Sequence, residues 1–171
     1  MQGPEFETPR CVLRPLSRPD RDALHALWTG SGVRRYLWDD EVITLDRTTE
    51  VIERSEQMFC GSRCGLWGAH WNDPARLAGF CGLWMFRETA DLELLYGVAE
   101  DLWGHGYAAE MAEAVIAYCF GALDMSVVRA STDAGNSASV RVLEKLGFRF
   151  TRRETIAGLD TVFYARERWG R

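Results

Sequence analysis

The chain has 171 residues, of which 47% are hydrophobic and 26% charged, and its formal net charge is -5. This length suits one domain with a buried core, and the negative charge argues against nonspecific nucleic-acid binding, which needs a basic face. No apolar run approaches the roughly 20 residues that cross a bilayer, and the first residues lack the basic and apolar regions typical of a signal peptide. We therefore expect a cytoplasmic single-domain protein over residues 1–171, with residues 1–7 disordered and no nucleic-acid or membrane partner.

The five cysteines form neither a disulfide framework nor a metal-binding pattern. Cys60 and Cys64 are the only close pair, and the three histidines are scattered along the chain. A zinc site needs further ligands at similar spacing. We expect reduced, mostly structural cysteines and no metal.

The first half of the chain predicts a strand, two helices and a hairpin, because apolar periodicity changes at capping residues and glycines. Ser17, three residues before Asp20, marks a helix start, and Gly30 and Gly32 mark its end. The predicted elements are a strand over 11–16, a helix from 17 to about 30, a second helix over 51–59, and strands over 65–71 and 77–86 joined by a turn at 72–74.

The second half predicts alternating strands and helices around a glycine-rich turn. They are a strand over 92–98, a helix from 108 to 119, a strand over 127–132, a helix from Asn136 to Gly147, and strands over 148–151 and 161–165. Alternation in the strand 92–98 places Glu93, Leu95 and Gly97 on one face. The fold class is α/β (α+β), with a mixed sheet of about seven strands and four helices.

The glycine-rich turn is the strongest functional signal. Gly104 and Gly106 let the backbone turn sharply just before a helix, whose first N–H groups and macrodipole favour an anion. A P-loop is excluded because no Lys-Ser or Lys-Thr follows. Ala109 formally completes a dinucleotide fingerprint, but several elements precede the glycines, which disfavours a Rossmann unit. A turn that only connects a strand to a helix remains the alternative.

Two blocks of sequence together resemble the GNAT N-acetyltransferase superfamily, and within it the ribosomal-protein N-terminal acetyltransferase branch. Trp103 to Ala108 is similar to the pyrophosphate loop, and 136–148 is similar to an N-x-x-S-x-x-V-x-E-K-L-G-F block. The resemblance covers nearly the whole chain and implies splayed central strands. It departs at Asp101, where the superfamily often has Gln or Arg. We expect the backbone rather than this side chain to face the phosphates, with affinity for coenzyme A somewhat reduced.

The resemblance implies acetyl-CoA as co-substrate, held at its pyrophosphate by backbone N–H groups of the loop and along its pantetheine arm by the splayed strands. The cofactor-binding residues that it implies are Tyr96, Gly97, Val98, Trp103, Gly104, His105, Gly106, Tyr107, Ala108, Asn136 and Ser139. Without the resemblance, packing or a bulge is the preferred explanation of Gly97. Asn136 can cap the helix and contact the cofactor together, and Ser139 is equally explained as a solvated helix position.

Acetyl transfer to an amine needs a neutral nitrogen near the thioester carbonyl, an oxyanion donor and a proton for the leaving sulfur, and much of the rate can come from position alone. We expect Glu93 as base, with Glu154 as the second choice, and a backbone N–H near Val98 as oxyanion donor. Alternation along the strand explains Glu93 equally as an exposed position. Ser139 is the expected proton donor to the thiolate, with Tyr96 or Tyr107 as alternatives.

The acceptor side is less specified by the sequence. The acidic run Asp39 to Glu41 lies in a loop that borders the acceptor groove in this family, where it steers a cationic amine or is simply solvated. Trp38 and Trp84 either wall that groove or pack in the core.

The predicted function is N-acetyl transfer from acetyl-CoA to a primary amine, either a protein N-terminal α-amine or a small-molecule amine, by direct attack in a ternary complex. The alternative is an acyl-CoA-binding module without turnover. The predicted assembly is a monomer or a homodimer.

Overall fold

A computed structural model describes residues 3–71, 76–86 and 91–168. Its helices are α1 (Arg21–Thr29), α2 (Ser31–Leu37), α3 (Leu45–Ser62), α4 (Tyr107–Gly121) and α5 (Ser137–Lys145), with short 3-10 helices η1 (Arg18–Asp20) and η2 (Glu100–Leu102). Its strands are β1 (Phe6–Glu7), β2 (Cys11–Pro15), β3 (Leu66–Trp71), β4 (Leu77–Met85), β5 (Leu92–Val98), β6 (Val127–Asp133), β7 (Arg149–Ile156) and β8 (Leu159–Glu167).

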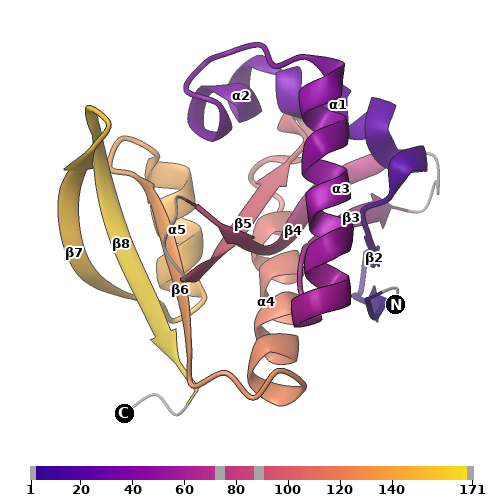
Figure 1. Ribbon diagram of the computed structural model, residues 1–171. Helices are drawn as coiled ribbons and strands as arrows, with labels where there is room; N and C mark the ends of the chain where they lie inside the picture. The colour runs from indigo at the N-terminus through magenta and orange to yellow at the C-terminus, as the bar shows by residue number, and fades with distance from the viewer. Residues whose placement is uncertain (1–2, 72–75, 87–90, 169–171) are drawn as a thin grey trace.

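The strands form one sheet in the order β1-β2-β3-β4-β5-β6-β8-β7, shown in Figure 1. Neighbouring strands are antiparallel except β5 and β6, which are parallel and connected through α4. Along the described parts of these two strands the register holds one pair, Glu93 with Arg129, whereas β5 and β6 pair along their length with β4 and β8. The sheet therefore opens beyond Glu93, which confirms the splayed central strands.

Each face of the sheet has its own hydrophobic cluster. On one face, α4 and α5 cover residues that include Leu94, Val98 and Val128. On the other face, α1, α2 and α3 pack over β3 and β4 around Trp28 and Phe80. Apolar side chains at helical spacing thus meet alternating side chains of the strands.

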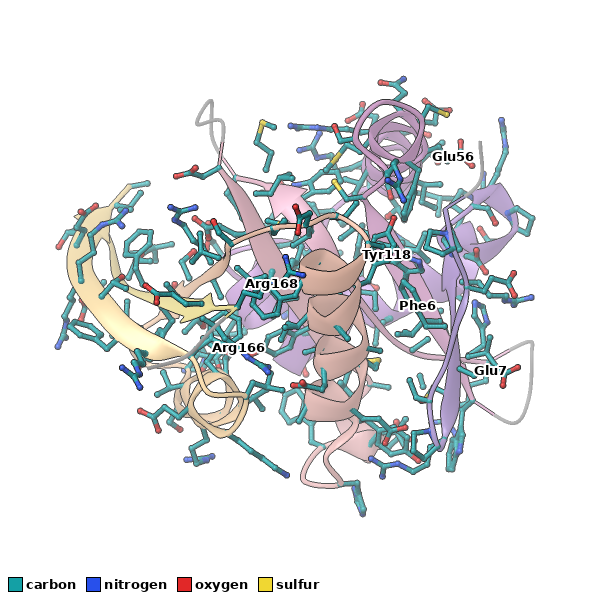
Figure 2. The ribbon with its side chains drawn as sticks, turned by 90° about the horizontal axis from the view of Figure 1, so that it is seen from below. Phe6, Glu7, Glu56, Tyr118, Arg166 and Arg168 are labelled. Carbon is teal, nitrogen blue, oxygen red and sulfur yellow. The ribbon has the colours of Figure 1, made fainter. Side chains whose placement is uncertain are left out.

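Helix α4 lies between the N-terminal strands and the strands β7 and β8, as Figure 2 shows in a view from below. Near its C-terminal end, Tyr118 packs against Phe6 of β1 with ring centroids 5.2 Å apart. On the opposite side, Arg166 of β8 donates to Glu113 of α4 at 2.7 Å, and Arg168 pairs with Asp124 just after the helix. The helix therefore contacts both sides of the sheet, β1 on one side and β8 on the other.

The predicted class and most elements are confirmed, with two additions in the described residues. The expected counts of seven strands and four helices are too low, since the described residues form eight strands and five α-helices. The segment that was expected to be disordered, residues 1–7, is too long, because Phe6 and Glu7 form strand β1 and pair with Leu13 and Val12 of β2. The predicted turn at 72–74 falls outside the described residues.

Candidate active site

The turn before α4 has the geometry of an anion site. Gly104 and Gly106 adopt φ values of 77° and 82°, which favour glycine. The N–H groups of the first helical residues, Tyr107 onward, have no acceptor within α4. Arg10 supports the loop from outside by donating to the carbonyl oxygen of His105 at 2.8 Å and pairing with Glu110 at 2.6 Å. The loop fits a pyrophosphate group through backbone donors.

Trp103 contributes its side chain rather than its backbone N–H. That N–H donates to the carbonyl of Glu100 at 3.2 Å, so the expected cradle from Trp103 to Ala108 is too long by one residue. The indole Nε1 instead donates to the carbonyl oxygen of Val98 at 2.8 Å. This bond ties the loop to the end of β5. The imidazole of His105 stays within the loop, with Nδ1 2.8 Å from the carbonyl of Trp103.

The Asp101 side chain forms an exposed ion pair with Arg76, the residue before β4. The carboxylate is therefore matched by a cation, and the repulsion of a phosphate is reduced. This arrangement agrees with the expectation that the backbone and not Asp101 faces the ligand.

Tyr107 lies on the wrong side of the loop to act as the acid. Its ring is buried, packs edge-on against Trp71 at 5.7 Å and lies under the guanidinium of Arg10 at 3.9 Å. Both neighbours belong to the β2–β3 side of the sheet, away from the opening beside β6. The proposed alternative acid Tyr107 is thus a packing residue.

The backbone of β5 offers hydrogen-bonding groups to the opening. The N–H of Ala99 donates to Ala78 on the β4 side at 2.9 Å, so by alternation the groups of Tyr96 and Val98 point toward β6. The carbonyl of Val98 accepts from Trp103, which leaves its N–H directed into the opening. Gly97 has a packing reason instead, since a Cβ there would lie 2.5 Å from the ring of Phe80.

On the α4–α5 face, the predicted residues Tyr96, Asn136 and Ser139 come together. The hydroxyl oxygens of Tyr96 and Ser139 are 2.8 Å apart, and the amide oxygen of Asn136 accepts from the backbone N–H of Ser139 at 3.1 Å. Asn136 therefore caps α5, as its capping interpretation required. Burial raises the pKa of Tyr96 well above its usual range, so its hydroxyl stays protonated at neutral pH.

Glu93 lies on the opposite face of the same strand. Its side chain is 8% exposed and accepts a hydrogen bond from the hydroxyl of Ser131 in β6. It lines a groove of about 660 Å³ together with Arg129, Phe163 and other residues of β6 to β8. Directly opposed residues of paired strands share a face, and Phe80 and Trp84 of β4 pair with Gly97 and Glu93. The alternation predicted for β5 is confirmed.

Glu154 is not close to Glu93. It lies on the edge strand β7, is exposed and pairs with Arg152 at 2.7 Å. Glu154 pairs with Thr161 of β8. Glu93 pairs with Arg129 of β6, which in turn pairs with Ala165 of β8, four residues further along that strand. The structure therefore favours Glu93 over Glu154 as the carboxylate of the site.

The acidic loop lies near the open end of β6. Asp40 pairs with Arg34 at 2.8 Å, and burial together with the nearby charges of Asp39 and Asp160 raises the pKa of Asp133. The charge of Asp39, in the loop after α2, therefore acts on the last residue of β6. Trp38 packs edge-on against Trp28 at 5.5 Å, as a core position would.

Sequence reasoning missed Ser131, Arg10, and the indole of Trp103. A serine in a strand and an arginine near the N-terminus carry no motif, and their partners are 38 and 100 residues away in the chain. Only the register between β5 and β6 brings Ser131 to Glu93. Among the described residues there is no cluster of three metal-ligating side chains and no helix long and apolar enough to cross a membrane.

Comparisons with known proteins agree with this arrangement. Residues 10–149 match the acetyltransferase (GNAT) domain family. The uncharacterized N-acetyltransferase YoaA of Bacillus subtilis is 28% identical over 146 residues, which cover 85% of this chain and 82% of YoaA.

Solved structures share the fold. An acetyltransferase from Agrobacterium tumefaciens superposes with a TM-score of 0.84 at 21% identity, covering 98% of this chain and 96% of its own. The ribosomal L7/L12 alpha-N-protein acetyltransferase RimL, in complex with coenzyme A, has a TM-score of 0.81 at 16% identity, with 96% and 98% covered. The family match over most of the chain, together with the loop and the opened sheet, shows that this protein belongs to the GNAT acetyltransferase family and is an acyltransferase.

Proposed function

We propose that the protein transfers the acetyl group of acetyl-CoA to a primary amine by direct attack in a ternary complex. The observation that carries this proposal is that Glu93 and the Tyr96–Ser139 pair lie on opposite faces of β5 at the opening of the sheet. An amine approaching from the Glu93 side meets a thioester approaching from the Ser139 side. The two substrates need no shared path.

The binding of acetyl-CoA is supported by two kinds of backbone donor. The N–H groups at the start of α4 fit the pyrophosphate, and the unpaired groups of β5 suit the pantetheine amides as a neighbouring strand would. Because the loop is fixed by Arg10 and by the indole of Trp103, both sets of donors are held in place before the ligand arrives.

The reaction follows from these groups. An α-amine has a pKa of about 7.7 to 8.0, so a useful neutral fraction exists at pH 7.5, whereas a lysine amine near 10.4 depends more on a base. Glu93 takes the proton of the attacking amine, directly or through water. The N–H of Val98 stabilises the oxyanion, and the hydroxyl pair of Tyr96 and Ser139 supplies a proton to the departing thiolate.

The acceptor under this proposal is a primary amine. The acidic loop after α2 supports a cationic acceptor, since the negative charge of Asp39 acts on Asp133, the last residue of β6. An N-terminal α-amine is favoured by analogy with RimL and by its lower pKa. The protein works as a monomer or homodimer in the cytoplasm under this proposal.

The test is an amine panel with wild-type protein, E93Q and the matched control E154Q. The panel contains a serine-initiated peptide, spermidine, kanamycin and an amino acid, and thiol release from acetyl-CoA is measured alongside the mass of the product. We expect intersecting initial-velocity lines and a 100-fold or greater loss of kcat in E93Q, since a general base contributes about 10²- to 10⁴-fold. E154Q should match wild type.

Three outcomes would contradict the proposal. Parallel velocity lines would indicate an acetyl-enzyme rather than direct attack. Full activity in E93Q would leave positioning alone as the source of rate. Coenzyme A binding without acetylation of any amine in the panel would favour the binding module.

A further inference from the structure

We propose that Ser131 is a positioning residue that holds the carboxylate of Glu93 at the point where β5 and β6 separate. The inference rests on the proposed role of Glu93 as base. It adds a residue that carries no motif and lies on the strand across the opening.

The contact is defined by the register of the two strands. Glu93 pairs with Arg129, and Ser131 follows two residues later on the same face of β6. The hydroxyl of Ser131 donates to Oε2 of Glu93. The side chain of Glu93 therefore leans along the strands, toward the open end where the amine and the thioester would meet.

The hydrogen bond leaves one carboxylate oxygen for chemistry. In the described part of the chain, no second side chain donates a hydrogen bond to Glu93. With Oε2 occupied by Ser131, Oε1 is the oxygen that takes the proton of the amine. The serine adds a neutral donor, so it orients the carboxylate without an ion pair that would compete with a cationic amine.

The guanidinium of Arg129 is a competing partner for the Glu93 carboxylate. Arg129 is the register neighbour of Glu93 on the same face, and its guanidinium contacts Asp91 only at 3.8 Å, with 48% of the side chain exposed. Without Ser131, the Glu93 carboxylate is free to turn back toward this guanidinium. Such an ion pair would draw the base away from the opening.

The test is a double-mutant cycle of S131A and E93Q, with S131T as the conservative variant and S126A as the matched control. Ser126 lies on the groove that Glu93 lines, but its structural contact is its backbone carbonyl, which accepts from the backbone N–H of Arg168. The fastest amine of the panel and acetyl-CoA are the probes, and kcat, both KM values and the melting temperature are measured for each variant.

We expect S131A to lower kcat about tenfold, the size of one hydrogen bond to a charged group, with the KM for acetyl-CoA unchanged. S131T should recover most of the loss, and S126A should match wild type. In the E93Q background, S131A should cause no further loss, because its effect passes through the carboxylate.

The outcomes separate this inference from the proposed function. Wild-type kcat in S131A combined with a large loss in E93Q would overturn the role of Ser131 alone. Equal losses from S131A in both backgrounds would mean that the serine stabilises the strands rather than the base, which also overturns it. Full activity in E93Q would overturn the base and the role of Ser131 together.

Discussion

Replacing Gly104 by alanine tests whether the loop backbone holds the pyrophosphate. Its φ is 77°, and no heavy atom lies within 4 Å of a Cβ placed there. Alanine therefore adds no clash and only the cost of a left-handed backbone, about 1–2 kcal/mol. The free loop can relax to avoid this cost, and coenzyme A must then restore the strained form. The Kd for coenzyme A should rise about 5- to 30-fold.

The matched control is Gly121→Ala at the last residue of α4. A Cβ at Gly121 also meets nothing within 4 Å, and its backbone needs no positive φ. Titration calorimetry with coenzyme A should give wild-type affinity for G121A and weakened affinity for G104A, with melting temperatures close to wild type for both. Unchanged affinity in G104A would refute the assignment of the holding donors to this backbone.

Three further outcomes follow from contacts around the site. Arg76→Ala should weaken coenzyme A binding about two- to fivefold at low salt, with recovery at high salt, because the negative charge of Asp101 then repels the phosphates without a neighbouring cation to offset it; an equal loss in D101N would contradict this. Tyr96→Phe should lower kcat about tenfold without changing the KM for acetyl-CoA. Because burial raises the pKa of Tyr96, its hydroxyl keeps its proton as pH rises, and kcat should show no decline from this group up to pH 10; tyrosine-like titration of kcat would oppose it. Iodoacetamide at pH 8 should alkylate the exposed Cys60 first, since burial raises the pKa of Cys64 to about 11, and intact mass and peptide mapping will identify the site.

The elements that the sequence predicts well are those with strong periodicity or a cap. The face of α4, the Asn136 cap and the alternation of β5 are all confirmed, because each depends on neighbours within a few residues. Helix α2 was missed since Gly30 and Gly32 are typical of a helix end. In the structure the N–H of Gly32 donates to Glu100 at 2.6 Å, a tertiary contact that keeps glycine inside the helix.

The parts of the site that sequence reasoning missed depend on contacts between distant segments. The resemblance indicated which strands splay, but not how far along they separate or which side chain of β6 reaches Glu93. Trp103 was expected to contribute only its backbone N–H, and the role of its indole was missed. Loop motifs describe the backbone and carry no information on the direction of a side chain. Register and rotamer are properties of the folded sheet.

The opened sheet also bears on how the protein unfolds. Residues 127–167, a continuous stretch of chain, form β6, α5, β7 and β8, and in the sheet they meet the preceding strands through the pair of Glu93 and Arg129. Further links are the hydrogen bonds of Ser131 to Glu93 and of Ser139 to Tyr96, together with α4 and its ion pair with Arg166. A ligand bound in the opening would contact both residues 127–167 and the preceding strands. Cooperativity of unfolding should therefore depend on coenzyme A. In the free protein, residues 127–167 should exchange their amide hydrogens separately from the rest of the chain, and in the complex the two parts should exchange together.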